Sequence, residues 1–182
     1  ISNADIIEKL GLPLFVKPSA GGSSFGITKV KEADQLSPAI EKAFKESDEV
    51  VVESFVAGTE VTCGMYKTRS KTVVLPVTEV VSKNEFFDYD AKYKNQSDEI
   101  TPARISDTLT RQIQATTEKI YDLVGAKGIV RVDYIIEESG RIVLLEVNTT
   151  PGMTPQSFLP QQIKAAGLSI QDVMRDIIED AF

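Results

Sequence analysis

Hydrophobic residues follow two different spacings along this chain, and each spacing predicts a different kind of element. Short runs rich in Val, Ile, Tyr and Phe predict strands, because such side chains suit a half-buried pleated surface. Apolar positions that recur every three or four residues after a capping Ser predict helices. The expected strands span 12–17, 27–31, 49–56, 60–66, 71–82, 129–137 and 141–148, and the expected helices span 37–47, 106–124, 156–166 and the residues after Ser169.

The last two strands are joined by a short segment containing Ser139-Gly140, which is typical of a β-hairpin. If these two residues form the loop, counting back along the strands places Asp133 opposite Glu146. The same register places Arg131 opposite Asn148. A longer turn with a bulge at the glycine is the alternative, and it would change the register.

Because side chains alternate between the two faces of a strand, these four polar residues are expected on one face. Ile135 and Leu144 would lie further along that face. Two directly opposed carboxylates repel each other, and a hard divalent cation such as Mg²⁺ would relieve the repulsion. A solvated polar face with unrelated charges is the alternative. The opposite, core-forming face is expected to carry Val130, Val132, Tyr134, Ile136, Val143, Leu145 and Val147.

The composition excludes several classes of chemistry. The 182 residues carry a net charge of −7, which argues against a general nucleic-acid-binding surface. The chain contains no histidine, which excludes Ser-His-Asp catalysis, Cys-His catalysis and His-ligated zinc. The single cysteine, Cys63, lies in an apolar run and is expected to be buried and unreactive, which fits a reducing cytoplasm. No apolar run approaches the roughly 20 residues needed to span a bilayer.

Residues 19–26, SAGGSSFG, join two expected strands and form a candidate phosphate-binding flap. Backbone N–H groups of such a tip can surround phosphate oxygens, with the hydroxyls of Ser23 and Ser24 as further donors and Lys17 as a nearby charge. The glycine spacing fits neither a Walker A loop nor a dinucleotide-binding fingerprint. A flexible hairpin loop remains the alternative.

Two further segments are candidates for a nucleotide site. The strand at 49–56 carries Glu53 just before Phe55 and Val56, so it is either an edge strand or a strand leading into an apolar adenine pocket. Residues 84–102 are polar, aromatic and irregular, and they include Lys92 and Tyr93. A loop of this length either serves a function, here covering a nucleotide, or is a mobile surface loop.

Four separated motifs agree with one family. They are VKPSAGGSSFG at 16–26, VVESFVAGTEV at 51–61, FFDYDAKY at 86–93 and VRVDY…LLEVNTTPGMTPQSF at 130–158. Together they closely resemble the ATP-grasp ligases, in particular the D-alanine–D-alanine ligases, over nearly the whole chain. The resemblance implies an α+β fold in which a partial small subdomain with the flap, 1–56, precedes a mostly antiparallel sheet backed by helices, 57–182, with ATP between the two parts.

The resemblance also implies a role for each candidate residue. Those implied to hold two Mg²⁺ ions, with Mn²⁺ as an alternative, are Asp133, Glu146 and Asn148. Those implied to contact ATP phosphates are Lys17, Ser23, Ser24 and Lys92, and those implied to line the adenine and ribose site are Glu53, Phe55, Val56 and Glu60. Those implied to act at the reacting groups or the second D-alanine are Arg131, Gly152, Ser157, Phe158, Ser23 and Tyr93.

The implied reaction is ATP-dependent joining of two D-alanines through an acyl phosphate, for peptidoglycan precursor synthesis. Such phosphoryl transfer needs positioning and charge neutralisation more than a nucleophilic side chain, so a site without histidine suffices. The chain starts at Ile1 without methionine, and it resembles only the carboxy-terminal portion of the family. We therefore expect it to need a missing N-terminal domain, with no nucleic-acid or membrane partner, in a cytoplasmic enzyme for which a homodimer is an option.

One residue departs from the family pattern, since many members carry an acidic residue where this chain has Gly21. Hydrogen bonds from such a carboxylate therefore cannot be carried over. Two alternatives to the main hypothesis remain open at this point. One is another ATP-grasp carboxylate–amine ligase with a different acceptor, and the other is a nucleotide-binding fragment without turnover.

Overall fold

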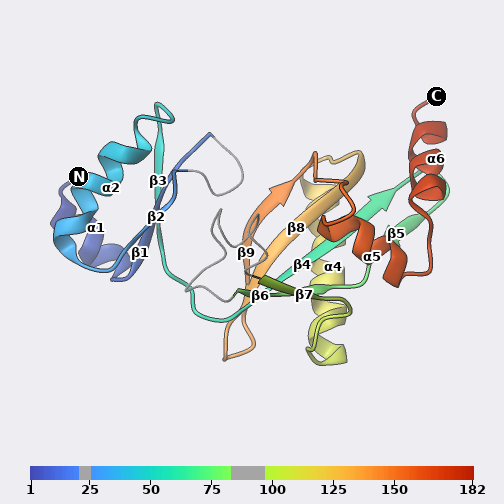
Figure 1. Cartoon of the computed structure of the whole chain (residues 1–182), viewed down its shortest axis with the longest axis horizontal. Helices are drawn as coiled ribbons and strands as arrows, with labels where there is room; N and C mark the ends of the chain where they lie inside the picture. Colours follow the sequence, from blue (N-terminus) through green and yellow to red (C-terminus); the bar gives the residue numbers. More distant parts are fainter. Residues whose placement is uncertain (21–25, 83–96) are drawn as a thin grey trace. The chain divides into compact units, whose positions relative to one another are not determined.

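The computed structural model of the chain describes residues 1–20, 26–82 and 97–182, and these form two compact units (Figure 1). Of the described residues, unit 1 contains 1–56 with Ser82 and Ser97, and unit 2 contains 57–81 and 98–182. Each unit has its own sheet and its own hydrophobic core. Antiparallel sheets backed by helices confirm the α+β expectation. No helix among the described residues is both long and apolar enough to cross a membrane.

Unit 1 is a three-stranded antiparallel sheet with two helices on one face. The sheet order is β2-β1-β3, from β1 (Leu14–Pro18), β2 (Thr28–Val30) and β3 (Val50–Ser54). The helices are α1 (Asn3–Leu10) and α2 (Leu36–Ala43), which follows the 3₁₀ turn η1 (Ala33–Gln35). Leu14 and Val16 are fully buried in the core that both helices share. Phe15 and Lys17 alternate with them and therefore lie on the opposite face.

The helix starts in unit 1 differ from the expectation. Helix α1 was not expected, and it begins with a capping box in which Ser2 and Asp5 bond each other's backbone N–H groups. Ser37 was expected to cap the second helix, but α2 already begins one residue earlier, directly after η1. The side-chain oxygen of Gln35 instead accepts from the backbone N–H of Lys31, at 2.8 Å.

Unit 2 is built on a six-stranded sheet in which the long strands β4 and β8 pair over nine residues. The main path of the sheet is β7-β6-β4-β8-β9, and β5 pairs separately with β4. The strands are β4 (Thr59–Lys67), β5 (Thr72–Val74), β6 (Thr78–Ser82), β7 (Ser97–Ile100), β8 (Gly128–Ile136) and β9 (Ile142–Asn148).

Helices cover both faces of this sheet (Figure 1). Helix α4 (Asp107–Leu123) packs Ile113 on the face that carries Cys63 and Val132. Burial raises the pKa of the Cys63 thiol to about 12, so the residue is buried and protonated as expected. Helices α5 (Phe158–Ala165) and α6 (Ile170–Asp180) pack on the other face, where Leu159 and Ile163 contact the core around Tyr66 and Leu75.

The β8–β9 hairpin reaches the expected pairing with the longer loop that was the alternative, together with a bulge in β9 that was not expected. Three residues, 138–140, form the loop, and Gly140 adopts φ +84°, which favours glycine. This longer loop shifts the register by one residue, but Leu145 is an extra residue in β9 opposite the Asp133/Tyr134 step. The two shifts cancel, so the predicted pairs of Asp133 with Glu146 and of Arg131 with Asn148 are confirmed.

Because of the bulge, the sheet faces predicted for residues 142–145 of β9 are wrong. Val143 was expected in the core, but it pairs with Ile135, whereas Ile142 packs against the core. Leu145 was also expected in the core, and it is 37% exposed. Leu144 was expected beside Ile135, and it pairs instead with the buried Tyr134.

The other edge of the sheet also differs from the expectation. The single strand predicted at 71–82 is two strands, β5 and β6, separated at Leu75–Val77. Pro76 lies in this break, and proline has no N–H to donate to a neighbouring strand. Strand β7 lies near the end of the segment 84–102 that was expected to be irregular, and residues 84–96 of that segment are outside the description.

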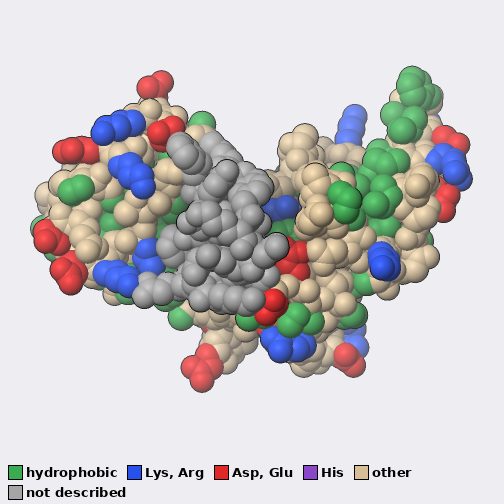
Figure 2. Space-filling model, in the orientation of Figure 1, with side chains coloured by type: hydrophobic (Ala, Val, Ile, Leu, Met, Phe, Trp, Pro, Cys, Tyr) green, Lys and Arg blue, Asp and Glu red, His purple; other side chains and the backbone are tan. Residues whose placement is uncertain are grey.

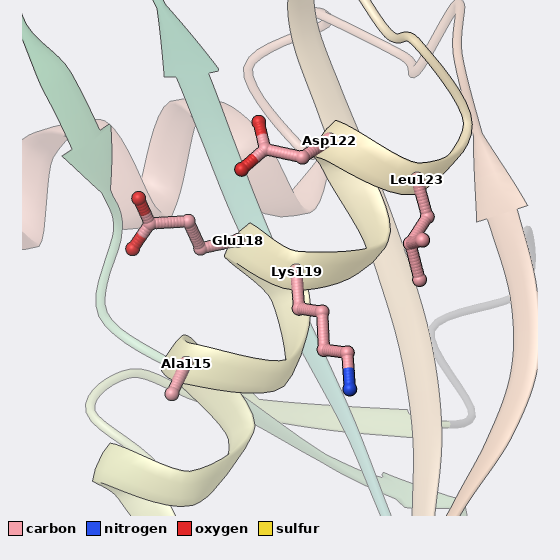
Figure 3. A pocket seen from close by; sticks show the side chains of 5 residues that line it. All are labelled: Ala115, Glu118, Lys119, Asp122 and Leu123. Carbon is pink, nitrogen blue, oxygen red and sulfur yellow. The ribbon is translucent and has the colours of Figure 1, made fainter.

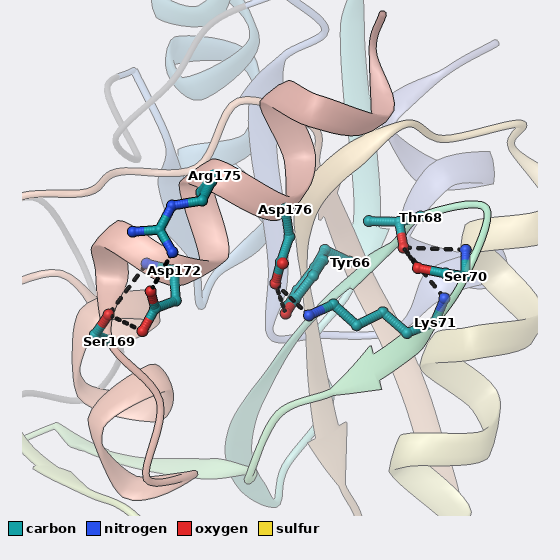
Figure 4. A network of polar contacts seen from close by, with 8 residues as sticks. All are labelled: Tyr66, Thr68, Ser70, Lys71, Ser169, Asp172, Arg175 and Asp176. Atoms are coloured by element: carbon teal, nitrogen blue, oxygen red, sulfur yellow. Dashed lines mark hydrogen bonds and ion pairs between the residues drawn. The ribbon is translucent and has the colours of Figure 1, made fainter.

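Polar contacts hold α6 against the β4–β5 turn (Figure 4). The hydroxyl of Tyr66 donates to Asp176 Oδ2 at 3.0 Å, and Lys71 pairs with the same carboxylate. Lys71 is the largest cause that lowers the pKa of Asp176. Hydrophobic side chains remain on the surface over this helix (Figure 2). Ile178 of α6 is 58% exposed.

We predict that Asp176→Asn lowers the melting temperature of the chain at pH 7 and has a smaller effect in acid. The pKa of Asp176 is lower in the folded state, so its contribution is present above the unfolded value of about 3.9 and is lost as pH falls through the folded value. Thermal unfolding of both proteins between pH 7 and pH 2.5 measures this difference. Glu179→Gln, at an exposed position of the same helix, is the control, and an equal difference at every pH would contradict the prediction.

Candidate functional site

Four polar side chains lie together on the two-stranded ribbon of β8 and β9. Arg131 and Asp133 are two residues apart on β8, and they pair with Asn148 and Glu146 on β9. Glu60 of β4 pairs with Ile135, so it belongs to the same face. We name this face of the unit 2 sheet, with Glu60, Arg131, Asp133, Glu146 and Asn148, the site face.

The charges on the site face are arranged around one guanidinium group. Arg131 Nε and one terminal nitrogen each donate to a different oxygen of Asp133, both at 2.8 Å. The same terminal nitrogen lies 3.7 Å from Glu146 Oε1. The amide nitrogen of Asn148 donates to Asp133 at 3.1 Å and to Glu146 at 2.9 Å. The two opposed carboxylates are therefore bridged by Arg131 and by the amide.

The site face combines a buried ion pair with an accessible carboxylate. The side chains of Arg131 and Asp133 are 14% and 12% exposed, whereas that of Glu146 is 56% exposed. Burial lowers the pKa of Arg131, but the hydrogen bonds and charge of Asp133, together with the charges of Glu146 and Glu60, raise it above its ordinary value. Arg131 therefore stays charged, and Glu146 is the site-face acid that a ligand reaches most easily.

The carboxylates of the site face do not form a complete metal-binding cluster by themselves. Within the described ranges of the chain, no three Asp, Glu, Cys or His side chains gather closely enough to hold an ion. The third oxygen would come from the amide of Asn148. In the structure its nitrogen faces the carboxylates, so rotation of the amide by half a turn would present its oxygen instead.

The start of α5 brings one of the expected substrate residues, Phe158, close to Arg131. The ring of Phe158, the first residue of α5, lies 5.2 Å from the Arg131 guanidinium carbon. The hydroxyl of Ser157 lies 2.9 Å from that of Thr154. A Cβ on Gly152 would lie 2.9 Å from the same Ser157 hydroxyl, so a larger residue at this position would require the hydroxyl to move.

The expected adenine and ribose residues of unit 1 lie on the sheet face opposite its helices. Lys17 Nζ donates to Glu53 Oε1 at 2.8 Å, across strands β1 and β3. Phe55 follows β3, with its ring centroid 6.0 Å from that of Phe15 and 4.0 Å from Lys29 Nζ. This face therefore offers two lysines, one carboxylate and two rings. Val56 is half-buried at the end of the unit.

Four predicted site residues lie outside the described residues. They are Ser23, Ser24, Lys92 and Tyr93. Their assignment to the phosphate flap and to the covering loop remains a prediction. The remaining site residues fall into two groups, with Lys17, Glu53, Phe55 and Val56 in unit 1 and Glu60, Arg131, Asp133, Glu146, Asn148, Gly152, Ser157 and Phe158 in unit 2.

Sequence reasoning missed three polar residues next to the site face. Gln161 donates to the carboxylate of Glu99 and more weakly to the backbone oxygen of Gln156, at 3.4 Å. Burial raises the pKa of Glu99, although Gln161 and the charge of Arg131 lower it in part. Gln162 is fully buried beneath α5. A polar residue between the apolar positions Leu159 and Ile163 was the only sequence signal for it.

A shallow depression on the outside of α4 is a weaker candidate (Figure 3). It is lined by Ala115, Glu118, Lys119, Asp122 and Leu123. Its two carboxylates already pair with Lys67, at 3.2 Å and 2.7 Å. Exposed pairs of this kind are ordinary surface features, so these two carboxylates do not indicate a catalytic site.

Comparison with known proteins identifies the family of the chain. The chain matches the family described as D-ala D-ala ligase C-terminus over residues 2–179. It is 64% identical to the D-alanine--D-alanine ligase of Bacteroides fragilis, covering 100% of this chain and 56% of the relative. The chain thus spans about half the length of the curated relatives it matches.

Two solved structures are also similar. One is the VanG D-Ala:D-Ser ligase from Enterococcus faecalis, with TM-score 0.84 and 40% identity over 97% of this chain and 51% of that chain. The other is D-alanyl-alanine synthetase A from Vibrio cholerae, with TM-score 0.83 and 30% identity over 98% of this chain and 55% of that chain. With a fold and a site face of this kind, and with a family match over nearly its whole length, the chain belongs to the D-ala D-ala ligase C-terminus family.

Proposed function

We propose that this chain supplies the metal site, the acceptor site and part of the ATP site of a D-alanine–D-alanine ligase. In this reaction a carboxylate oxygen of the first D-alanine takes the γ-phosphoryl group of ATP and releases ADP. The amine of the second D-alanine then attacks the acyl phosphate, losing a proton, and inorganic phosphate leaves as the peptide bond forms. Both steps build up negative charge on oxygen, which fixed cations stabilise.

The observation that carries the proposal is the direct opposition of Asp133 and Glu146 on the site face. Their oxygens, with the amide oxygen of Asn148, form a donor set that suits Mg²⁺ beside phosphate groups. Thr62 of β4 is the strand partner of Asp133 on β8. Its hydroxyl is buried and has no hydrogen-bond partner among the described residues. A hydrated ion would satisfy it. When bound, Mg²⁺ would neutralise the phosphate oxygens and hold them in line for transfer.

The other residues of unit 2 act on the reacting groups. Arg131, which is held in place by Asp133 and Phe158, is a fixed cation for the oxyanion of the tetrahedral intermediate. The backbone N–H of Gly152 is a second donor for that oxygen. The hydroxyl of Ser157, at the start of α5, binds the carboxylate of the acceptor.

Unit 1 is proposed to bind the nucleotide through its helix-free face. Lys17 contacts phosphate oxygens and Glu53 contacts the adenine or ribose, so the ion pair between them is exchanged for ligand contacts. Phe55 supplies an apolar wall for the base, with Val56 beside it. Ser23, Ser24 and Lys92 are assigned to the phosphates, Glu60 to the ribose, and Tyr93 to the reacting groups. ATP is the cofactor that the family implies.

A second candidate for the acceptor substrate is D-serine. The chain is 40% identical to a D-Ala:D-Ser ligase but 30% and 32% identical to two D-alanine-joining enzymes of known structure. Phosphate release by the full-length natural protein, measured with D-alanine alone and with D-serine or D-lactate added as the acceptor, separates these candidates. A higher kcat/KM for D-alanine than for D-serine is expected, and the reverse order would assign the second function.

We predict that Glu146→Gln in the full-length natural protein lowers kcat by more than the roughly 10–100-fold typical of changes around a metal's ligands. The amide removes one negative charge from the proposed donor set. Dipeptide formation against Mg²⁺ concentration is the measurement, and the exposed Glu138→Gln in the hairpin loop is the matched control. Near-normal activity of Glu146→Gln at low Mg²⁺ would remove the metal assignment.

We also predict that residues 1–182 alone form no detectable dipeptide. The chain covers 56% of a curated relative, so about half of such an enzyme is absent from it. Calorimetry with Mg²⁺-ATP beside a ligation assay distinguishes nucleotide binding from turnover. Dipeptide synthesis by these 182 residues would show that the rest of the relative's length is dispensable for catalysis.

A further inference from the structure

Strand β4 has a gap on one edge, and a side chain fills it. Strand β6 pairs with β4 up to Thr62, and β5 pairs with it only from Met65 onward. Between these points the amide of Gln162, from α5, takes the place of a neighbouring strand. Its oxygen accepts from the N–H of Gly64 at 2.9 Å, and its nitrogen donates to the backbone oxygen of Thr62 at 3.0 Å.

All hydrogen-bonding positions around this amide fit a glutamine. The second hydrogen of the Gln162 nitrogen is donated to the hydroxyl of Thr78 at 3.1 Å. The side chain is 0% exposed, so water cannot replace these bonds. Gly64 has no side chain, and a Cβ there would lie 2.2 Å from Leu159 and 2.7 Å from the Gln162 oxygen. Glycine in β4 and glutamine in α5 therefore fit each other.

The two β4 residues that Gln162 bonds are the strand partners of two residues of the site face. Gly64 pairs with Arg131, and Thr62 pairs with Asp133. Gln162 also lies one helical turn after Phe158, whose ring lies 5.2 Å from the Arg131 guanidinium carbon. The glutamine thus fixes how far α5 is shifted along β4, and that shift decides where the ring meets the guanidinium.

We propose that Gln162 is a positioning residue for the ligation reaction, because its amide sets the place of α5 and thereby of Phe158 and Arg131 over the acceptor site. This inference rests on the proposed function for its catalytic meaning. Its structural part concerns this chain alone. Leu159 and Ile163 already supply apolar contact to α5, and apolar contact is non-directional. The hydrogen bonds of the Gln162 amide define the direction and the distance of α5 relative to β4.

Gln162→Met tests the proposal, because it preserves side-chain length and burial but removes all three hydrogen bonds. In the full-length natural protein we expect kcat to fall about tenfold and the KM for the acceptor to rise, with the KM for ATP unchanged within about twofold. A purely structural role would lower the melting temperature and leave these kinetic constants unchanged in the folded fraction. Gln112→Met, at an exposed position of α4, is the matched control.

A spectroscopic measurement on residues 1–182 does not depend on catalysis. The Arg131 Nε–H resonance is expected to move in Gln162→Met, because the ring current of Phe158 no longer falls on it in the same way. In a Phe158→Leu background, Gln162→Met should then cause no further movement of this resonance. In the unaltered chain, the Gly64 amide should exchange with solvent as slowly as the β4 amides that pair with neighbouring strands. This measurement needs no variant, so it can be made even if the variants do not fold.

The outcomes separate the two proposals. An unmoved Arg131 resonance with an unchanged acceptor KM, or rapid exchange of the Gly64 amide, would overturn the positioning role. If the unaltered full-length protein makes no dipeptide, the proposed function fails, and a moved resonance would still support the placement of α5 by Gln162. A moved resonance with a changed acceptor KM supports both.

Discussion

The site depends on one electrostatic constraint, the pairing of Asp133 with Glu146 on adjacent strands. Two unit charges about 5 Å apart repel by roughly 3 kcal/mol at an effective dielectric of about 20, and by less where one is well solvated, as Glu146 is. Arg131 and the amide of Asn148 offset this repulsion in the structure.

The packing of α5 connects this constraint to the rest of unit 2. The helix is only eight residues long and carries a proline, so its place is set by tertiary contacts rather than by its own stability. Leu159 and Ile163 bury its apolar side, and Gln162 completes the open edge of β4. The same helix begins with Phe158, whose ring lies next to Arg131. The packing of α5 therefore also affects the geometry of the site face.

Much of the fold followed from local patterns. The cap and apolar repeat predicted α4 within one residue of its observed ends, and the hairpin pattern placed Asp133 opposite Glu146. The latter was correct although the assumed loop was wrong, because the longer loop and the extra residue Leu145 cancel. A bulge of this kind depends on how β9 meets its neighbours, so no local signal revealed that Val143 would leave the core.

The sequence by itself determined the chemistry of the chain. It predicted a site without histidine, built from carboxylates, lysine and arginine, and its motifs pointed to the family over nearly the whole length. Only the tertiary structure decided that Arg131 bridges the two acids and that Gln162 reaches Gly64, 98 residues earlier in the chain. The physical reason is that residue type and spacing reflect local preferences, whereas these contacts form only where distant segments pack together.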